Sequence, residues 1–182
     1  MTVSCVIGFG KMKNENSDPQ DWQAFCQGDN SAMVRLYTRH SPAIFSYCLY
    51  LSGNRTQSED IVQEAFLKLM ATGQNGRAVQ SVRAWLIVTA RNMVLNHATR
   101  NREVAIEGLS DAVFASQSDT ELAMTVKRLL EGLNMDDREL FLLREHQGFS
   151  IREISQMLAL SEENVRVRLF RIRKQMREQV RR

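Results

Sequence analysis

The sequence has little of what catalytic and metal-binding sites are usually built from. Its three cysteines and three histidines are scattered, with no CxxC or HExxH spacing, over Cys5, Cys26, His40, Cys48, His97 and His146. We therefore expect buried, unpaired thiols, and neither a disulfide framework nor a metal site. The sequence also lacks a phosphate-binding glycine loop, a GxSxG motif and any spacing that supports a Ser/His/Asp set. No catalytic residue and no cofactor is predicted, and the sequence gives no support to an enzyme.

Long apolar runs are absent as well. No stretch of about 18 apolar residues occurs, so no membrane insertion is expected. Residues 1–10 lack the basic start and the full apolar stretch of a secretory signal. The net charge of +3 is modest, which makes basic residues a local feature of this chain. Met12 opens a polar stretch, so both Met1 and Met12 remain candidates for the natural start.

A strong two-helix pattern is present at residues 148–177. Ser150 and Glu153 have the spacing of a capping box, and apolar residues then recur at helical intervals. After a short turn, Ser161 is placed to cap a second helix, whose first turn carries Glu162 and Glu163, as the helix dipole favours. This arrangement is typical of a helix-turn-helix, whose second helix enters the major groove of DNA.

The second helix of this motif is densely basic. Its apolar stripe is expected to comprise Val165, Leu169, Ile172 and Met176. The opposite face carries Val167 and Phe170 among cations, and exposed apolar side chains cost solvation free energy unless a partner covers them. Thymine methyl groups would cover them, while arginines contact guanine edges or phosphates. The alternative is a solvated, charged C-terminal helix, which the capped helix before it disfavours.

The chain as a whole is predicted to be all-α, with two small helical domains joined by a flexible linker. Its only prolines are Pro19 and Pro42, and we expect Pro42 in the first turn of a helix capped by Ser41. A short helix pair is predicted within residues 21–38, broken at residues 28–30. Further helices are predicted at 59–71, 82–102, 121–132 and 136–147, with Ser58 and Ser81 as caps and Gly73 as a stop. The domains are predicted as a poorly ordered N-terminal extension at 1–20, a helical domain at 21–102, a linker at 103–118 and a helix-turn-helix domain at 119–182.

Two further segments have contrasting surfaces. The predicted helix at 58–70 carries Asp60, Gln63 and Glu64 on its outer side, which suits either plain solvation or docking of a basic protein partner. The segment 77–102 contains arginines and no acid between them, which suits contact with single-stranded nucleic acid. Trp85 lies on the apolar stripe of that segment and is expected to be a core residue instead of a base-stacking one.

These segments together resemble the extracytoplasmic function (ECF, group IV) sigma factors of bacterial RNA polymerase. Residues 36–45 resemble the opening of conserved region 2, and residues 58–69 resemble region 2.2. Residues 82–92 resemble regions 2.3 and 2.4, and residues 148–177 resemble region 4.2. The blocks occur in the family's order and spacing, and the resemblance extends over residues 22–178.

The resemblance implies a role for each surface. Asp60, Gln63 and Glu64 would bind core RNA polymerase, at the β′ coiled coil, with the β subunit as a further partner. The −10 promoter element would be contacted by Gln74, Asn75, Arg77, Arg83, Arg91, Asn92 and Asn96. The −35 element would be contacted by Asn164, Arg166, Val167, Arg168, Phe170, Arg171 and Lys174. The resemblance also implies a cytoplasmic protein that promotes promoter melting and is held inactive by an anti-sigma factor.

Four positions depart from the family pattern. Asn96 stands where many members carry an aspartate, Ala159 replaces the usual glycine of the turn, and Glu162 with Glu163 replaces small residues at the start of the recognition helix. If Ala159 has a positive φ, its conformation costs up to about 1 kcal/mol. A stand-alone helix-turn-helix regulator is the alternative function, although it needs neither the acidic nor the arginine-rich surface.

Overall fold

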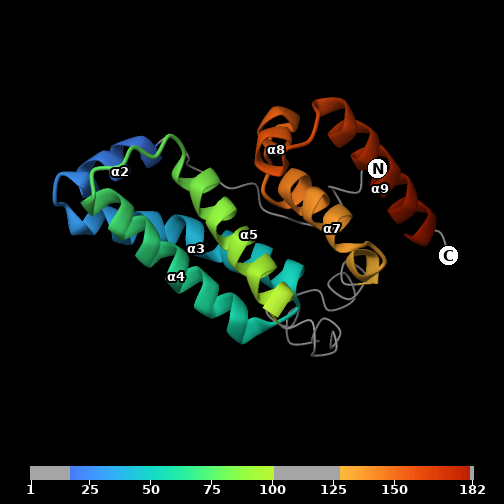
Figure 1. The fold of residues 1–182 in the computed structure, drawn as a ribbon, viewed down its shortest axis with the longest axis horizontal. Coiled ribbons are helices and arrows are strands. Elements are labelled where there is room, and N and C mark those ends of the chain that lie inside the picture. Colours follow the sequence, from blue (N-terminus) through green and yellow to red (C-terminus); the bar gives the residue numbers. More distant parts are fainter. Residues whose placement is uncertain (1–16, 101–127, 181–182) are drawn as a thin grey trace. The chain divides into compact units, whose positions relative to one another are not determined.

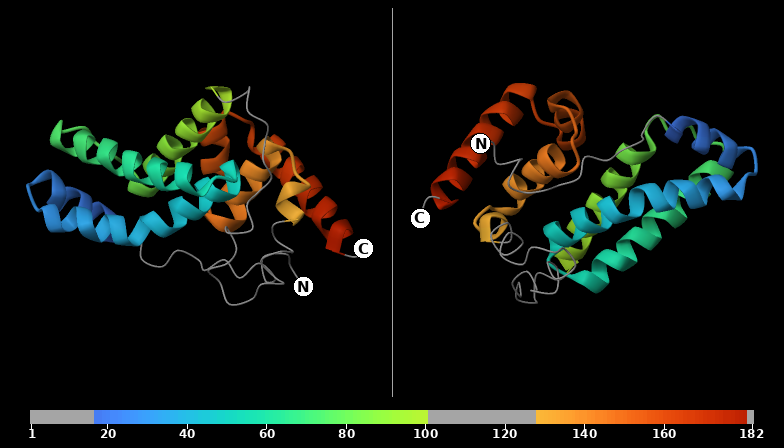
Figure 2. Two further views of the ribbon diagram at one scale, coloured as in Figure 1. Left: turned by 90° about the horizontal axis from the view of Figure 1, so that it is seen from below. Right: turned by 180° about the vertical axis from the view of Figure 1, so that it is seen from behind.

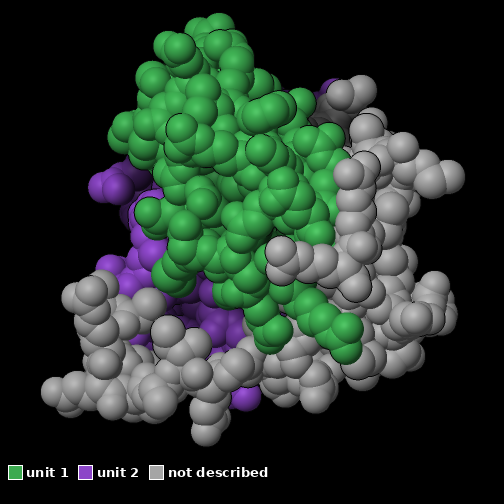
Figure 3. Space-filling model, turned by 90° about the vertical axis from the view of Figure 1, so that its right-hand side faces the viewer, with its two compact units in different colours: residues 1–12, 109–182 green, residues 13–108 purple. Residues whose placement is uncertain are grey.

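The computed structural model describes residues 17–100 and 128–180, and every regular element in these ranges is a helix (Figure 1). The chain divides into two compact units, shown in different colours in Figure 3. In chain order, the first unit contains α2 to α5 (purple, unit 2 in the key), and the second unit contains α7 to α9 (green, unit 1 in the key). The elements are α2 (Asp18–Cys26), α3 (Asn30–Ser52), α4 (Arg55–Gln74), α5 (Val82–Arg100), α7 (Met135–Phe141), the π-helical turn η3 (Leu142–His146), α8 (Ile151–Leu158) and α9 (Glu162–Val180). The all-α prediction is confirmed. The predicted linker at 103–118 lies outside the described residues.

Helix α3 is the centre of the first unit, where it packs against α2, α4 and α5 (Figures 1 and 2). Its inner face carries Leu36, Ile44 and Tyr47, each at most 1% exposed. Leu69 of α4 and Leu86 of α5 complete this core and are fully buried. The sequence periodicity therefore identifies the buried faces of these helices well.

The predicted helix start at Ser41 and Pro42 is wrong, because α3 continues through Pro42 without a break. A proline inside a helix removes one backbone hydrogen bond and costs about 3 kcal/mol. Buried side chains at Leu36, His40 and Ile44 continue along one face across the proline. Packing of this continuous face against three helices outweighs the local cost.

Helix α4 also begins and ends elsewhere than predicted. Its N-cap is Asn54, whose side chain accepts a hydrogen bond of 3.0 Å from the backbone N–H of Gln57. Ser58, the predicted cap, is fully buried inside the helix, where its hydroxyl donates to the carbonyl of Asn54 at 2.7 Å. Gly73, the predicted stop, is the penultimate residue of the helix. Ser81 does cap α5, accepting from the backbone N–H of Ala84 at 3.2 Å.

A network of charged residues joins α2 to α3. Burial opposes ionisation of Asp21, but hydrogen bonds from Arg35 and Arg39 outweigh this effect and lower its pKa. Asp18 accepts from Arg39 at 2.5 Å and lies 2.7 Å from Nε2 of the buried His40. Because α2 begins at Asp18, residues 18–20 belong to the helical unit and not to the extension predicted at 1–20.

The second unit contains the predicted helix-turn-helix. Ser150 and Glu153 form both hydrogen bonds of the capping box at the start of α8. Ala159 has φ 53° and ψ 41°, the left-handed conformation expected of the family's glycine. Ser161 caps α9 by accepting from the backbone N–H of Asn164 at 3.1 Å. The motif is therefore built as the sequence predicts.

The helix predicted at 136–147 differs in one respect. It begins at Met135, directly after the N-cap Asn134. Its main departure from the prediction is that the last part, from Leu142 to His146, is π-helical and not α-helical. Of the helix predicted at 121–132, residues 128–131 are described and are helical. Within the described part of the chain, no helix is both long and apolar enough to cross a membrane.

The cysteines differ from one another. Cys48 is fully buried, and burial raises the pKa of its thiol to about 12, as expected for an inert core residue. Cys26, also predicted to be buried, is exposed at the end of α2. Cys5 lies outside the described residues. No group of three or more potential metal ligands occurs within residues 17–100 and 128–180.

Candidate nucleic-acid interface

Helix α9 has one apolar and one polar face, with two exceptions on the polar face. The predicted stripe is confirmed, since Val165, Leu169, Ile172 and Met176 are each at most 2% exposed. On the opposite face, Phe170 is 63% exposed and Val167 is 43% exposed. They lie among the exposed side chains of Asn164, Arg166, Arg171 and Lys174. An exposed aromatic ring surrounded by cations is suited to the apolar and anionic parts of a nucleic acid.

Not every arginine of α9 is available in the same way. Arg171 is exposed, and no ion pair holds it within the described ranges. Arg166 pairs with Glu162 one turn earlier, at 2.7 Å on an exposed surface. Arg168 instead reaches across to α7, where its Nη2 lies 2.7 Å from Oδ1 of Asp137. The sequence places Arg168 with the DNA-contacting residues, whereas the structure turns its guanidinium toward its own domain.

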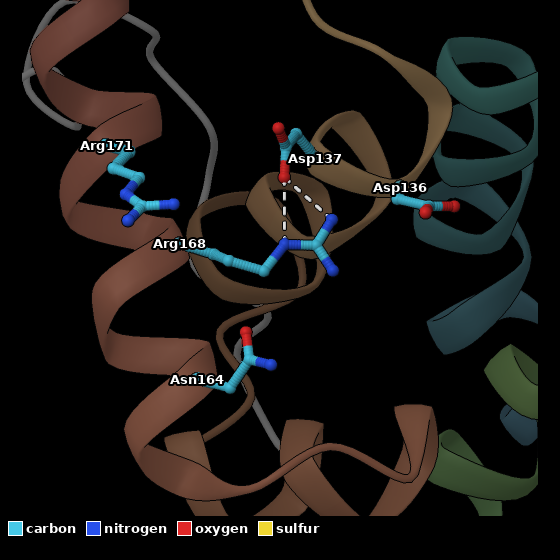
Figure 4. Close-up of a pocket in the computed structure, with 5 residues that line it drawn as sticks. All are labelled: Asp136, Asp137, Asn164, Arg168 and Arg171. Carbon is cyan, nitrogen blue, oxygen red and sulfur yellow. Dashed lines mark hydrogen bonds and ion pairs between the residues drawn. The ribbon is translucent and has the colours of Figure 1, made fainter.

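A shallow hollow of about 360 Å³ opens beside α9 (Figure 4). Asn164, Arg168 and Arg171 line it from α9, and Asp136 and Asp137 line it from the first turn of α7. In Figure 4, Arg168 lies between Asn164 and Arg171 and extends toward Asp137. The hollow therefore combines two carboxylates with two guanidinium groups, and the carboxylates would repel a phosphate placed inside it.

The outer face of α4 is formed as predicted. Asp60, Gln63 and Glu64 are all exposed, and Glu64 pairs with Lys68 at 2.8 Å. Leu67 lies on the same face, about one helical turn after Glu64, and is 64% exposed. The sequence pattern was not used to predict this exposed leucine. The spacing i, i+3, i+4, i+7 from Asp60 is the signal that would have found it. An acidic face with one apolar side chain is suited to a protein partner.

The α4–α5 loop and α5 agree only partly with the predictions. Gln74, Asn75 and Arg77 are exposed around the loop, and Asn92 and Asn96 are exposed on α5. Arg91 is half-buried, and Arg83 is only 8% exposed, so the structure does not bring Arg83 to the surface with the others. The reason is that Ile87, Ala90 and Val94, which lie on the same side of α5 as Arg83, are also buried. The buried face of α5 is therefore wider than the sequence pattern indicates and includes Arg83.

Trp85 also differs from the expectation. It was expected in the core, but the structure leaves it half-buried, while its neighbour Leu86 is fully buried. At 100° per residue, Trp85 lies on the same side of α5 as the exposed Asn92 and Asn96. A partly exposed indole on this side of the helix is suited to stacking with an unpaired base.

These features define a class of protein: a two-unit helical protein with a helix-turn-helix in its second unit and an exposed acidic face on α4 of its first unit. Two family models match the chain, "Sigma-70 region 2" over residues 36–104 and "Sigma-70, region 4" over residues 123–176. Together they cover more than half of the sequence. The chain belongs to the sigma-70 family and is an RNA polymerase sigma factor of the ECF type.

Curated relatives are consistent with this assignment. The chain is 29% identical over 148 residues to the ECF RNA polymerase sigma factor SigL of Mycobacterium tuberculosis, covering 76% of this chain and 84% of SigL. It is 29% identical over 158 residues to the ECF RNA polymerase sigma factor BldN of Streptomyces coelicolor, covering 79% of this chain and 58% of BldN. The chain therefore spans somewhat more than half the length of BldN and most of SigL.

Solved structures agree on the fold. The sigma factor RpoE from Bartonella quintana, in complex with the anti-sigma factor NepR, matches with a TM-score of 0.62 at 25% identity, over 78% of this chain and 91% of that one. CnrH, in complex with the cytosolic domain of CnrY, matches with a TM-score of 0.65 at 21% identity, over 90% of this chain and 97% of that one. The latter supports the fold alone.

Proposed function

We propose that this chain binds core RNA polymerase, recognises −35 duplex and −10 promoter DNA, and helps to melt the promoter at the start of transcription. The observation that carries the proposal is the presence of both sigma-70 modules on one chain, with a DNA-suited face on α9. On this proposal the chain performs no catalytic step of its own. It would act in the cytoplasm, where core polymerase is found.

Recognition of the −35 element is assigned to the outer face of α9. Arg171 and Lys174 would contact base edges or phosphates, and Phe170 with Val167 would cover thymine methyl groups. Glu163 is also exposed near the start of the helix. A carboxylate at that position accepts a hydrogen bond from a cytosine amino group but repels phosphate, so it favours only some sequences.

Contact with the −10 element is assigned to the loop between α4 and α5 and to the exposed side of α5. Asn75 and Arg77 lie in or beside the loop, and Asn92 and Asn96 lie on the helix, all exposed. Amide and guanidinium groups beside a partly exposed indole suit a single strand with unstacked bases. Asn96 is neutral where many relatives are acidic, so its contact is expected to differ from theirs.

Binding of core polymerase is assigned to the outer face of α4. Asp60 and Glu64 supply negative charge, Gln63 supplies an amide, and Leu67 supplies an apolar anchor at 64% exposure. Charge complementarity of this kind steers association, while the buried apolar contact adds affinity. An anti-sigma factor is proposed as a further partner, because RpoE from Bartonella quintana forms a complex with one.

The test is transcription in vitro with bacterial core polymerase and a promoter library randomised in both elements. We expect transcripts only when the full chain is added, with enrichment of defined −35 and −10 sequences. Absence of chain-dependent initiation would overturn the proposal. Tight, specific binding of duplex DNA by the purified chain without polymerase would instead support a stand-alone helix-turn-helix regulator.

A further inference from the structure

Two ion pairs hold α9 to the rest of its unit. Arg168 donates to Oδ1 of Asp137 on α7 from Nε at 3.0 Å and from Nη2 at 2.7 Å. Arg173 donates to Oε1 of Glu145 on η3 from Nε at 3.1 Å and from Nη2 at 2.5 Å. In each pair, two N–H donors of one guanidinium group therefore bind the same carboxylate oxygen. We call these pairs the α7 brace and the η3 brace.

The two braces lie on opposite flanks of the helix. We take 100° per residue and measure angles from the midline of the buried stripe that runs from Val165 to Met176. Arg168 lies about 70° to one side of this midline, and Arg173 lies about 70° to the other side. By the same geometry, Val167 and Lys174 point almost directly away from the stripe. Phe170 and Arg171 lie about 130° to either side of its midline. The braces therefore sit between the buried face and the face proposed to read DNA.

The acidic side of each brace is itself fixed. The side chain of Asn134 donates to Oδ2 of Asp137 at 3.0 Å and accepts from its backbone N–H at 2.9 Å. The side chain of Glu145 is 11% exposed and belongs to the π-helical turn. The Asp137 carboxylate is thus held within its own element, and the Glu145 carboxylate is confined by burial, so both act as fixed points for α9.

Apolar burial and charged hydrogen bonds constrain a helix differently. The hydrophobic effect is non-directional, so the stripe determines which face of α9 turns inward but resists a small rotation only weakly. Charge-assisted hydrogen bonds require a defined geometry and are stronger than neutral ones. Two of them on opposite flanks oppose rotation of α9 about its own axis in both directions.

We propose that the α7 and η3 braces set the rotation of α9 and thereby direct its outer face toward the bases of the −35 element. Arg168 and Arg173 are then positioning residues, and Asp137 and Glu145 contribute to sequence specificity without touching DNA. This inference rests on the proposed function of α9 in −35 recognition. It assigns Arg168 a different role from the direct DNA contact that the sequence predicts.

The two roles of Arg168 predict opposite effects of one substitution. If Arg168 contacts DNA, then Asp137→Ala frees a cation and removes a nearby negative charge, so DNA binding tightens. If Arg168 is a brace, Asp137→Ala lets α9 rotate and weakens binding to the correct sequence. Asp136→Ala is the matched control, because it removes the same charge from the same helix turn, and no ion pair of Asp136 is found within the described ranges.

The experiment uses polymerase holoenzyme reconstituted with the full chain. The measured quantity is the ratio of affinities for a promoter with the selected −35 element and one with that element scrambled, over a series of salt concentrations. We expect Asp137→Ala and Arg168→Ala each to lower this ratio about tenfold, comparable to losing one base contact. Asp136→Ala should leave it unchanged. Exchange of the two charges, by Arg168→Asp with Asp137→Arg, should restore most of the ratio.

Other outcomes would overturn the inference. One is an Asp137→Ala variant that behaves like Asp136→Ala or binds more tightly. Another is a reduction by about one in the slope of log affinity against log salt for Arg168→Ala, which marks a lost phosphate contact. Should Asp137→Ala melt below the assay temperature, Glu145→Gln tests the other flank with the same expected loss. A wild-type holoenzyme that prefers no −35 sequence would contradict the proposed function itself and not the braces.

Discussion

Gly73 of α4 lies directly against the ring of Phe25 on α2. A Cβ atom at Gly73 would be 2.7 Å from Cε1 of Phe25 and 3.0 Å from Cη2 of Trp22. The ring atoms are buried and have no free space to move into, since Phe25 is 5% exposed and Trp22 is 7% exposed. The absence of a side chain at residue 73 is therefore what lets α2 approach α4 and complete the first unit.

Gly73→Ala should destabilise the first unit. Alanine favours a helix over glycine by up to about 1 kcal/mol, but overpacking of a filled core costs about 1–3 kcal/mol. We expect a net loss of about 1 kcal/mol in the free energy of unfolding, measured by urea denaturation of the full chain. Combination with Phe25→Leu should cost less than the sum of the two single substitutions, and strict additivity would argue against the contact.

Ala159→Gly should stabilise the helix-turn-helix. Ala159 is exposed and has φ 53°, so its methyl group adds strain and buries almost no surface. Release of that strain is worth about 1 kcal/mol, reduced somewhat by the greater freedom of glycine in the unfolded chain. The check is a higher melting temperature of the second unit. Ala78→Gly, in an exposed loop of the first unit without a positive φ, is the control and should not raise the melting temperature of that unit.

Asp60→Ala combined with Glu64→Ala should weaken binding to core polymerase. Both carboxylates are exposed on the outer face of α4, and their loss should mainly slow association at low salt. We expect an increase of about tenfold in Kd, measured by titration with labelled protein. Glu59→Ala is the control, because Glu59 lies about 100° around the helix from Asp60. Equal effects of the control and the double variant would contradict the docking assignment.

Arg171→Ala should separate the two binding activities. Arg171 belongs to the second unit and is exposed on α9, so core-polymerase affinity should not change. Recognition of the −35 element should fall by about 1–3 kcal/mol if the guanidinium reads a guanine edge. Competition between promoters that differ only in their −35 element measures this loss. A uniform decrease across all sequences would instead indicate a phosphate contact.

His146 should make the second unit sensitive to mild acid. Burial lowers its pKa to about 4, and Nδ1 lies 2.8 Å from the side-chain amide nitrogen of Gln147, from which the neutral ring can accept. The unfolded chain takes up a proton as the pH falls below about 6.5, whereas the folded chain does so only near the lowered pKa. Stability is therefore complete above about pH 6.5 and is lost progressively as the pH falls toward 4.

The measurement for His146 is the urea midpoint at several pH values between 7.5 and 4.5. His146→Gln should be less stable at neutral pH but should lose less on acidification. Parallel pH profiles of the two proteins would show that the ring is solvated in the folded state. Asp21 contributes acid sensitivity at lower pH, because its pKa lies below the usual value of 3.8.

Most of the helix-turn-helix could be predicted because its signals are local. Ser150 with Glu153 defines the start of α8, Ser161 defines the start of α9, and the apolar spacing selects the buried stripe. Such signals act within one or two helical turns and need no information from the rest of the chain. The exposure of Phe170 followed from the same spacing.

The errors arose where a distant part of the chain decides the outcome. Pro42 locally signals a helix start, yet α3 continues through it because three neighbouring helices bury its continuous face. Gly73 locally signals a helix stop, but α4 extends to Gln74 and packs Gly73 against the rings of α2. Arg83 was assigned to the surface, but packing around Ile87 and Val94 buries it.

By itself, the sequence determined the helical class, the DNA-suited motif and the acidic face of α4, since each depends on periodicity and capping along a single helix. Only the tertiary structure decided which arginines of α9 remain available. Arg168 and Arg173 resemble Arg171 in the sequence, but Asp137 and Glu145, 31 and 28 residues away, hold them within the domain. A charge is free or paired according to what lies beside it in space, and spacing along one helix does not contain that information.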